Sequence, residues 1–270
     1  MMWLNGEPVA ANLQCTTAAP KAAVGVFETL LVTEARLHFV DVHLQRLCRG
    51  LSRLSIILAA QHIDNDLQKA VGYLSTQFAV RGSWRLKYSV WLDDDSGVQR
   101  LLQLQRYDRD VASLQQQGVH VDISCQRLES EPALAGLKLL QRSHYDKARQ
   151  ECCNDQVFEA LMLDQQDHII EGSISNIFAV IHRDQQSILI TPPLHHGGVA
   201  GISRQLLLTH VGHGLQVEER YLPPLDEIAE LFICNSLLGI VPVVQLQQQH
   251  FAIGAVTRHI QQSYAALNPF

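Results

Sequence analysis

The sequence predicts an α+β protein with a small N-terminal α/β domain and a larger C-terminal domain. The first part of the chain has the pattern of a hairpin, then helices, then further strands, whereas short β-favouring runs dominate beyond residue 118. Between them lies the polar segment 109–118, which has the composition of a linker. With 270 residues, of which 47% are hydrophobic, the chain can bury a sizeable core. We therefore expect domains at 1–108 and 119–270.

In the N-terminal part, the runs 27–32 and 37–40 flank Thr33-Glu-Ala-Arg36, which suits a hairpin connection. Asp41 is a candidate N-cap for a helix whose apolar residues recur at helical spacing over 44–54. The other elements expected here are a helix over 59–78 and a hairpin in which strand 83–91 pairs with 101–107 across Asp93-Asp-Asp-Ser-Gly97.

The C-terminal part is strand-rich, and we expect a β-barrel-like or mixed sheet that carries surface helices. Helices are expected over 139–153 and 202–213. The short β-favouring runs are 119–125, 160–163, 169–172, 177–181, 188–190, 217–222, 231–234 and 241–246.

The charge pattern argues against nucleic acid and membranes as partners. The formal net charge is −6, and arginines occur singly rather than in basic runs. The N-terminus, Met1-Met-Trp-Leu-Asn-Gly-Glu7, lacks the basic start of a secretory signal. The longest apolar stretch, 231–244, contains Asn235, Ser236 and Pro242, and is too short and too polar to span a bilayer. These features favour a cytoplasmic protein.

The cysteines and histidines indicate neither a disulfide framework nor a metal centre. Six cysteines, Cys15 among them, include no CxxC pair and no scaffold spacing, which suits reduced thiols in the cytosol. His195-His196 and the pair His210 and His213 look most like metal ligands. Because no carboxylate or cysteine lies at a supporting spacing, we expect no metal.

Lys138 is the candidate catalytic residue. It lies in the run Leu134-Ala-Gly-Leu-Lys-Leu-Leu140 and is one of five lysines in the chain. Desolvation among leucines disfavours a protonated amine, and a neutral amine is a nucleophile that can form a Schiff base with a carbonyl. On spacing alone, a partly exposed structural lysine is the commoner outcome, so this assignment depends on features downstream.

Three downstream segments carry polar groups suited to a phosphorylated cofactor. Ile170-Glu171-Gly-Ser-Ile-Ser-Asn176 places a carboxylate at a strand end, and Cys234-Asn-Ser236 ends an apolar strand with small polar side chains. Gly198-Val-Ala-Gly-Ile-Ser-Arg204 leads into a helix, whose first-turn N–H groups bind phosphate well. Each segment alone is more often an ordinary turn. Together with Lys138 they are the parts needed to hold pyridoxal 5′-phosphate.

The order of these motifs resembles the fold-type IV pyridoxal-phosphate enzymes, which include branched-chain and D-amino-acid aminotransferases and 4-amino-4-deoxychorismate lyases. The resemblance covers nearly the whole chain. Its motifs are Phe27-Glu-Thr-Leu, His43-Leu-Gln-Arg46-Leu, Gly136-Leu-Lys138, Glu171-Gly-Ser-Ile-Ser-Asn176-Ile-Phe, Thr191-Pro-Pro-Leu, Gly201-Ile-Ser-Arg204 and Pro242-Val.

The resemblance implies roles for particular residues. Lys138 would carry the Schiff base, Glu171 would bond the pyridine nitrogen, and Arg46 would clamp the phosphate through a charge-assisted fork. It also implies a two-domain fold with the cofactor between the domains of a homodimer. The remaining cofactor-binding positions that it implies are Ser175, Asn176, Gly201, Ile202, Ser203, Asn235 and Ser236.

Within this family, two segments look like the lyase branch. Gly136-Leu-Lys-Leu-Leu-Gln-Arg142 resembles the lyase sequence around the cofactor lysine, and Ile233-Cys-Asn-Ser236 resembles the second phosphate strand of the lyases. Ser143 stands where branched-chain enzymes carry a tyrosine. We expect a lyase that converts 4-amino-4-deoxychorismate to 4-aminobenzoate and pyruvate in folate biosynthesis. An aminotransferase for D-amino acids or branched-chain amino acids is the alternative, and a non-catalytic binding module is a third.

Two segments depart from the family on the substrate side. Ala22-Ala-Val-Gly25 replaces the usual Tyr-Gly-Asp-Gly, and Trp91-Leu-Asp-Asp-Asp-Ser-Gly97 replaces an Arg-Gly-rich stretch that often helps to bind substrate carboxylates. Three acids beside a dicarboxylic substrate would repel it unless they point away.

Overall fold

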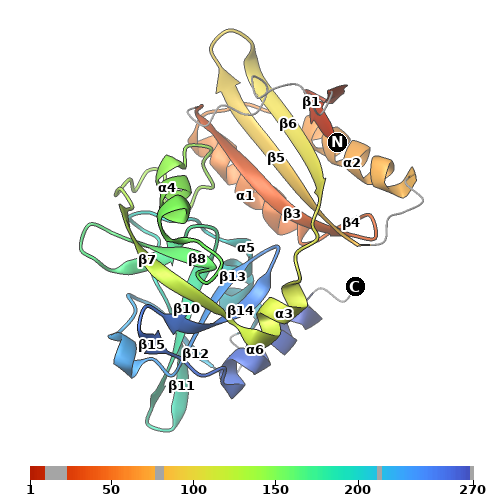
Figure 1. Ribbon diagram of the computed structural model, residues 1–270. Helices are drawn as coiled ribbons and strands as arrows, with labels where there is room; N and C mark the ends of the chain where they lie inside the picture. The colour runs from red at the N-terminus through yellow and green to blue at the C-terminus, as the bar shows by residue number, and fades with distance from the viewer. Residues whose placement is uncertain (10–22, 77–81, 212–214, 268–270) are drawn as a thin grey trace. The chain divides into compact units, whose positions relative to one another are not determined.

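The computed structural model describes residues 1–9, 23–76, 82–211 and 215–267. Cys15, His213 and the end of the helix predicted over 59–78 lie outside these residues. The chain divides into two compact units (Figure 1). Unit 1 comprises Met1–Arg109 and Leu137–Arg142, and unit 2 comprises Asp110–Gly136 and Ser143–Phe270. The segment that carries Lys138 therefore groups with the N-terminal unit, although the predicted boundaries place it in the C-terminal domain.

Unit 1 is an antiparallel sheet with two helices against one face (Figure 1). Within the described residues its strand order is β2-β1-β6-β5-β3-β4. The helices are α1 (Val40–Arg53) and α2 (Ala60–Thr76). The strands are β1 (Met2–Leu4), β2 (Glu7–Val9), β3 (Gly25–Thr33), β4 (Arg36–Leu37), β5 (Ser83–Asp93) and β6 (Gly97–Arg106).

The alternation of β3 separates the two faces of this sheet, because successive side chains of a strand point to opposite sides. Val26, Leu30 and Val32 belong to the apolar core that also contains residues of α1 and α2. Phe27 belongs to a second cluster, with Trp91, Leu101 and Leu140. The face opposite the helices is therefore built around Phe27.

Two predictions for unit 1 are confirmed and one is wrong. The long hairpin is confirmed, since Asp93 pairs with Gly97 where β5 turns into β6. The first hairpin is also present, but its second strand is only β4 rather than 37–40. Asp41 is not the N-cap: Phe39, at a left-handed φ of 52°, precedes the first turn of α1, and Asp41 lies within that turn. The left-handed residue ends the strand and starts the helix earlier.

Unit 2 contains a closed mixed β-barrel, because β9 pairs with both β8 and β10. Within the described residues six strands close the ring in the order β7-β8-β9-β10-β13-β14, in which β7 is parallel to β8 and to β14. The barrel strands are β7 (Val119–Arg127), β8 (Glu159–Leu163), β9 (Ile169–Gly172), β10 (Asn176–Arg183), β13 (Glu230–Asn235) and β14 (Gly239–Leu246). Three further strands, β11 (Gln186–Thr191), β12 (Gln216–Glu219) and β15 (Gln249–His250), extend the sheet.

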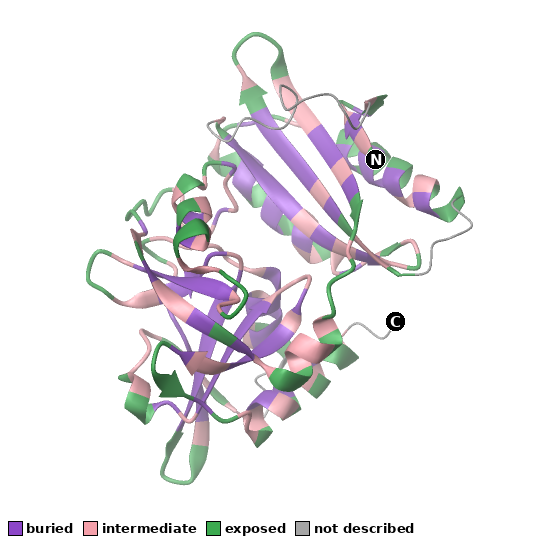
Figure 2. Ribbon diagram, in the orientation of Figure 1, coloured by how far each residue is buried: buried purple, intermediate pink, exposed green. Residues whose placement is uncertain are grey.

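The barrel strands are the most buried part of unit 2 (Figure 2). Every residue of β8 is buried, as are the first six of β10. Such continuous apolar runs are expected where both faces of a strand are covered. The barrel predicted from the dense run of short strands is thus confirmed, and it provides a rigid support for the strand ends.

The helices of unit 2 differ most from the prediction. The helix expected over 139–153 is wrong at its start: α4 is Ser143–Cys152, because Leu139 and Leu140 pair with β3 instead. The expected linker contains α3 (Val111–Gln117), and α6 (Ala255–Ala266) was not predicted. The helix expected over 202–213 is α5 (Ile202–Leu206), which continues as the π-helical turn η1 (Leu207–Val211). A short 3₁₀ turn, η2 (Leu225–Glu227), precedes β13.

Among the described helices, none is long and apolar enough to cross a lipid bilayer.

Candidate active site

Lys138 lies on a short extended segment along the edge of β3. The amide of Phe27 donates to the carbonyl of Lys138 at 2.9 Å, and the amide of Leu140 donates to the carbonyl of Gly25 at 3.0 Å. Gly25 permits this approach, since a Cβ there would lie 2.8 Å from a Leu140 methyl carbon and 2.4 Å from the Val90 carbonyl oxygen. Lys138 is half-buried, and its Nζ lies 4.7 Å from the centre of the Phe27 ring.

Arg46 lies in unit 1 within a buried charged cluster on α1. Its Nε and Nη2 donate to the two carboxylate oxygens of Glu28, at 2.8 and 2.6 Å. His43 Nδ1 lies 2.6 Å from Glu28 Oε2. Burial alone would raise the pKa of Glu28, but the Arg46 guanidinium and the His43 bond lower it to about 2. Two of the Arg46 nitrogens thus face Glu28, and its role as a phosphate clamp stays a prediction.

Glu171 is buried at the end of β9, and three donors hold its carboxylate. Tyr145 Oη donates to Oε1 at 2.5 Å, while Asn176 Nδ2 and the Val199 amide donate to Oε2 at 3.1 and 2.9 Å. The side chain is 2% exposed. A carboxylate with this many donors has a fixed orientation, as binding a ring nitrogen requires.

Glu159, on β8, supports the loop that joins β9 to β10. Its Oε1 accepts the amide of Ile174 at 2.6 Å, and its Oε2 accepts the hydroxyl of Ser175 at 2.8 Å. A Cβ on Gly172 would lie 2.3 Å from Glu159 Oε1, so the loop closes tightly around this carboxyl. Because Glu171 and Asn176 stand at the two ends of this loop, Glu159 determines where both side chains emerge. Burial raises the pKa of Glu159 above its ordinary value.

The predicted phosphate segment begins next to Asn176. Gly201 is the N-cap of α5, and a Cβ there would lie 2.0 Å from Asn176 Oδ1. The N–H groups in the first turn of a helix have no acceptor within the helix, so those of Ile202 and Ser203 suit an anion. The Ser203 hydroxyl lies 2.7 Å from Tyr264 Oη. A phosphate there would therefore meet backbone N–H groups before the Ser203 side chain.

Asn235 and Ser236, at the end of β13, lie on the strand that pairs with β10. Asn235 Nδ2 donates to the carbonyl of Ile174 at 3.2 Å, and its Oδ1 accepts the amides of Leu237 and Leu238, both at 2.9 Å. Asn235 therefore shapes the turn after β13 and ties it to the loop beside Glu171. Ser236 follows within this turn and is half-buried.

Unit 2 thus brings together a cluster of predicted residues from distant parts of its sequence, namely Glu171, Ser175, Asn176, Gly201 and Asn235. Sequence reasoning missed Tyr145 and Glu159. Tyr145 lies in a helix that was predicted from its pattern alone, which does not show that its hydroxyl reaches Glu171. Glu159 stands at the start of an apolar strand. A carboxylate opening an otherwise apolar run was the available signal for Glu159, because buried acids require partners.

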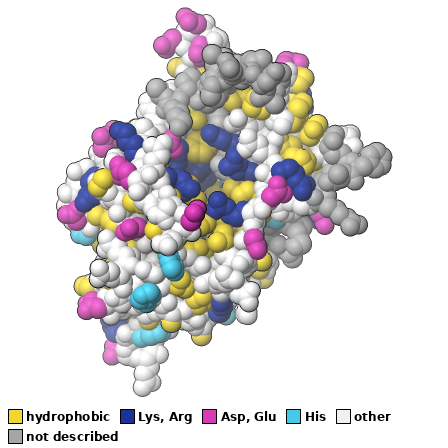
Figure 3. All heavy atoms as spheres, viewed as in Figure 1, with side chains coloured by type: hydrophobic (Ala, Val, Ile, Leu, Met, Phe, Trp, Pro, Cys, Tyr) yellow, Lys and Arg dark blue, Asp and Glu magenta, His cyan; other side chains and the backbone are white. Residues whose placement is uncertain are grey.

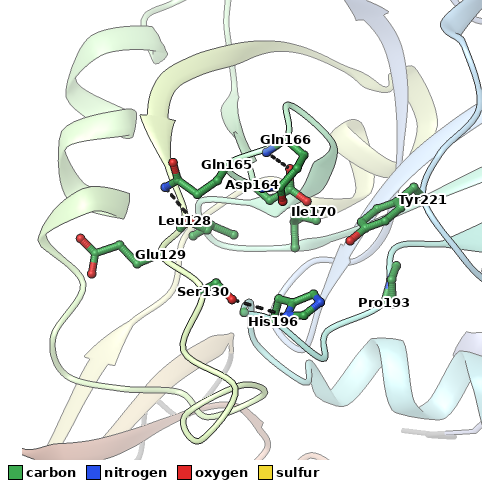
Figure 4. Close-up of a pocket in the computed structure, with 11 residues that line it drawn as sticks. Leu128, Glu129, Ser130, Asp164, Gln165, Gln166, Ile170, Pro193, His196 and Tyr221 are labelled. Atoms are coloured by element: carbon green, nitrogen blue, oxygen red, sulfur yellow. Dashed lines mark hydrogen bonds between the residues drawn. The ribbon is translucent and has the colours of Figure 1, made fainter.

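A pocket of about 230 Å³ in unit 2 lies apart from this cluster (Figure 4). Its wall includes Ile170, the neighbour of Glu171 on β9, and adjacent residues of a strand point to opposite faces. Ser130 and His196 are hydrogen-bonded across it at 3.4 Å. The pocket therefore belongs to the side of β9 that Glu171 does not face.

The acids of the β5–β6 turn fold onto their own hairpin. Asp93 Oδ1 accepts the Ser96 hydroxyl at 2.6 Å and the Ser96 amide at 2.9 Å, and hydrogen bonds with Ser96 lower the pKa of Asp93. Asp94 and Asp95 are exposed at the tip of the hairpin, where acidic side chains gather in Figure 3. The negative charges of these acids are therefore confined to the tip of the β5–β6 hairpin.

The residues present fit pyridoxal 5′-phosphate by the chemistry of the donor set. A half-buried lysine amine, a buried carboxylate with fixed orientation, and a glycine-capped helix start are all present. At Gly198, whose φ is 86°, a Cβ would approach the Glu171 carboxyl carbon to 3.3 Å. Gly198 therefore allows the backbone to pack closely against the Glu171 carboxylate, which a residue with a Cβ would prevent.

Comparisons with known proteins agree with this geometry. Residues 25–246 match the family model described as amino-transferase class IV, and the chain belongs to this family. Its members are fold-type IV enzymes that bind pyridoxal phosphate, and a hypothetical aminotransferase from Mycobacterium tuberculosis was solved in a PLP-bound form. That chain shares 16% identity, with a TM-score of 0.80 over 99% of this chain and 100% of that one, which shows the fold alone.

Two relatives are more similar in sequence. An aminodeoxychorismate lyase from Vibrio harveyi is 27% identical over 276 residues, covering 97% of this chain and 98% of that protein. The crystal structure of 4-amino-4-deoxychorismate lyase from Pseudomonas aeruginosa has a TM-score of 0.85 and 30% identity, with full coverage of both chains.

Proposed function

We propose that this protein is a pyridoxal-phosphate-dependent 4-amino-4-deoxychorismate lyase, which forms 4-aminobenzoate and pyruvate. The observation that carries the proposal is the similarity to the Pseudomonas aeruginosa lyase over 100% of both chains, at 30% identity. The similarity extends over both units of the chain, although two segments on the substrate side depart from the family pattern. The buried Glu171 carboxylate and the helix start at Gly201 support cofactor binding.

When bound, the cofactor supplies an aldehyde for imine formation and a ring that accepts the electron pair released beside the imine nitrogen. Lys138 would hold the cofactor through Nζ, and its amine would be freed when the substrate binds. Glu171, oriented by Tyr145 and Asn176, would keep a proton on the ring nitrogen. Backbone N–H groups at Ile202 and Ser203 would bind the phosphate, and Arg46 would contribute positive charge.

Lys138 also moves the proton in the proposed reaction. Its freed amine removes the proton from the ring carbon that bears the substrate nitrogen. The bond from the neighbouring carbon to the enolpyruvyl oxygen breaks, and the ring becomes aromatic. Lys138 then delivers the proton to the methylene carbon of the departing enolpyruvate, which becomes pyruvate. Proton removal and return by one amine balance the reaction without a co-reactant.

Product analysis tests this proposal directly. Purified protein loaded with pyridoxal phosphate is incubated with 4-amino-4-deoxychorismate, and 4-aminobenzoate fluorescence and pyruvate are followed. We expect equal amounts of both products, and Lys138→Ala should lose at least about 10³-fold in rate, as removal of a positioned proton-transfer group does. Transfer of amino groups from D- or branched-chain amino acids to keto acids, without pyruvate release, would instead identify an aminotransferase.

Two further results would contradict individual roles. If Lys138→Ala kept full turnover, the proposed role of Lys138 in the reaction would be rejected. Glu171→Gln should still bind the cofactor but lose most of its rate, because an amide cannot keep the ring nitrogen protonated. Unchanged turnover in that variant would reject this role for Glu171.

A further inference from the structure

The face of the unit 1 sheet opposite its helices carries three cationic side chains around one aromatic ring. Lys87 Nζ and Lys138 Nζ each lie 4.7 Å from the centre of the Phe27 ring, and the guanidinium carbon of Arg142 lies 5.5 Å from it. Because each charge lies within 5.5 Å of one point, no two of them are separated by more than twice that distance. Their fields add over a range close to the Debye length of roughly 8 Å.

Strand pairing explains why these groups converge. Lys87 and Ser89 are two residues apart on β5, so their side chains point to the same face of the sheet. Ser89 is the cross-strand partner of Phe27, and Lys87 is the partner of Thr29. Lys138 reaches the ring because its backbone pairs with β3, and Arg142 follows on the same segment. In the view of Figure 1 the sheet lies in front of α1, and Lys and Arg side chains gather on the face shown in Figure 3.

Two buried polar atoms accompany the cations on this face. Ser89 is 0% exposed and Trp91 is 4% exposed. They lie two and four residues after Lys87 on β5, so all three side chains point to the same face. Ser89 Oγ and Trp91 Nε1 have no hydrogen-bond partner within the part of the chain that the structure describes. A buried polar atom without a partner costs free energy, so such atoms mark places where a ligand or water completes the bonding.

We propose that Lys87 and Arg142 form the carboxylate-binding subsite for the substrate of this enzyme, with Ser89 and Trp91 as neutral donors beside them. The inference rests on the proposed function and deepens it: the substrate class is a cyclic amine with two carboxylates. Lys138 is assigned to the cofactor and the proton, and the two positive charges of Lys87 and Arg142 match the two carboxylates of such a substrate in number and sign. An amine with one carboxylate uses only part of this charge, so the subsite favours the dicarboxylate.

Chorismate tests the subsite apart from the reaction, because a hydroxyl replaces the amine and it cannot join the cofactor. Its dissociation constant is measured by calorimetry on the cofactor-loaded protein. We expect Lys87→Gln and Arg142→Gln each to weaken binding roughly 10-fold or more, as loss of a charge-assisted hydrogen bond does. Lys87→Arg, which keeps the charge, should restore most of the affinity, and 4-aminobenzoate, with one carboxylate, should lose less than chorismate.

Arg85→Gln is the matched control, since Arg85 lies two residues from Lys87 on β5, is exposed, and hydrogen-bonds Gln105. We expect it to bind chorismate within about 2-fold of the unmodified protein, because an exposed charge is screened. Raising the salt concentration should weaken chorismate binding in the unmodified protein more than in Lys87→Gln.

The outcomes separate the subsite from the reaction. If the unmodified protein does not bind chorismate, or if both Gln variants bind it as tightly as the unmodified protein, the subsite is overturned, whether or not lyase activity is present. If the variants lose chorismate affinity while the protein releases no pyruvate, the subsite is supported and the proposed lyase reaction fails. A rise in KM for 4-amino-4-deoxychorismate with little change in kcat supports both.

Discussion

At the scale of single residues, the site depends on two carboxyl groups with opposite tasks. Glu171 accepts hydrogen bonds from Tyr145 Oη, Asn176 Nδ2 and the Val199 amide, which fix the orientation of its carboxylate. Glu159 is fully enclosed beneath the neighbouring loop, and burial raises its pKa. Glu171 is therefore the acid of the proposed chemistry, whereas Glu159 holds the loop next to it in shape.

Tyr145→Phe should weaken cofactor binding while leaving the fold intact. The ring packs with Leu128, Ala148 and Met162, and phenylalanine keeps this packing. The hydroxyl bond to Glu171 is lost, and a hydrogen bond to a charged group contributes about 1.5–3 kcal/mol. We expect the dissociation constant for pyridoxal phosphate to rise at least about 10-fold, measured by fluorescence. Tyr73→Phe, against Trp3 in unit 1, is the control, and equal affinities in both variants would contradict the prediction.

Glu159→Gln should change the pH dependence of stability. The folded pKa lies above the ordinary value of 4.5, so above pH 4.5 the unfolded chain releases the proton while the folded protein keeps it. Stability from this group is therefore fully present below pH 4.5 and declines as pH rises towards the folded pKa. Glutamine does not titrate and can bond both Ile174 and Ser175. We expect the variant to gain stability relative to the unmodified protein as pH rises from 4.5, measured by urea unfolding.

The contrast with Glu159→Ala distinguishes this account from a general effect of substitution. Alanine leaves the Ile174 amide and the Ser175 hydroxyl without their acceptor, and each buried orphan costs about 1–3 kcal/mol. Glu159→Ala should therefore be destabilised at every pH. If both variants lose similar stability at pH 7, Glu159 is held as an ion and the prediction is wrong.

At the scale of elements, side chains from distant strands determine how helices begin. Glu230 on β13 accepts the amides of Val256 and Thr257, at 3.2 and 2.7 Å, at the start of α6. Gly254 permits this, because a Cβ there would lie 2.0 Å from Glu230 Oε1. The cap is non-local, and it ties the C-terminal helix to the barrel.

Glu230→Gln should loosen α6. Only one amide oxygen remains to accept two N–H groups, and the negative charge at the positive end of the helix dipole is lost. We expect a loss of about 1–2 kcal/mol in urea unfolding and faster proteolysis within α6. Glu227→Gln, three residues earlier and exposed, is the control. Equal protease sensitivity in the two variants would show that α6 does not depend on this cap.

At the scale of the whole molecule, each unit supplies a different part of the proposed chemistry. Unit 1 carries Lys138, Arg46 and the cationic face around Phe27. Unit 2 carries the carboxylate, the helix start and the loop that holds them. The homodimer implied by the family resemblance stays a prediction, which light scattering of the purified protein would check.

Pyridoxal phosphate should stabilise the whole protein, because a ligand that binds only the folded state shifts the unfolding equilibrium. At 100 times the dissociation constant the gain is about 2.7 kcal/mol, which corresponds to a rise in Tm of roughly 5–10 °C for a chain of this size. Thermal unfolding with and without the cofactor measures this. Lys138→Ala should show a smaller rise at the same concentration, and pyridoxal, which lacks the phosphate, a smaller one still. An unchanged Tm at saturating cofactor would count against binding.

Local patterns in the sequence predicted the strands and proposed the site residues, because strand alternation and short motifs are both local properties. Alternation predicted β5, a short β-favouring run predicted β9, and the order of motifs singled out Lys138, Glu171 and Gly201. The sequence carries no comparable signal for how the six barrel strands pair or in which register, because pairing joins segments far apart in the chain.

The surroundings of those residues depend on contacts between distant segments, which local patterns do not predict. A helical pattern continued through Leu139, but pairing with β3 supplied hydrogen bonds that a helix start there would not, so Lys138 lies on an extended segment. Tyr145 and Glu159 acquired their roles from partners 26 and 15 residues away. Such contacts form when folding brings distant groups within hydrogen-bonding distance, and no local pattern of residues encodes them.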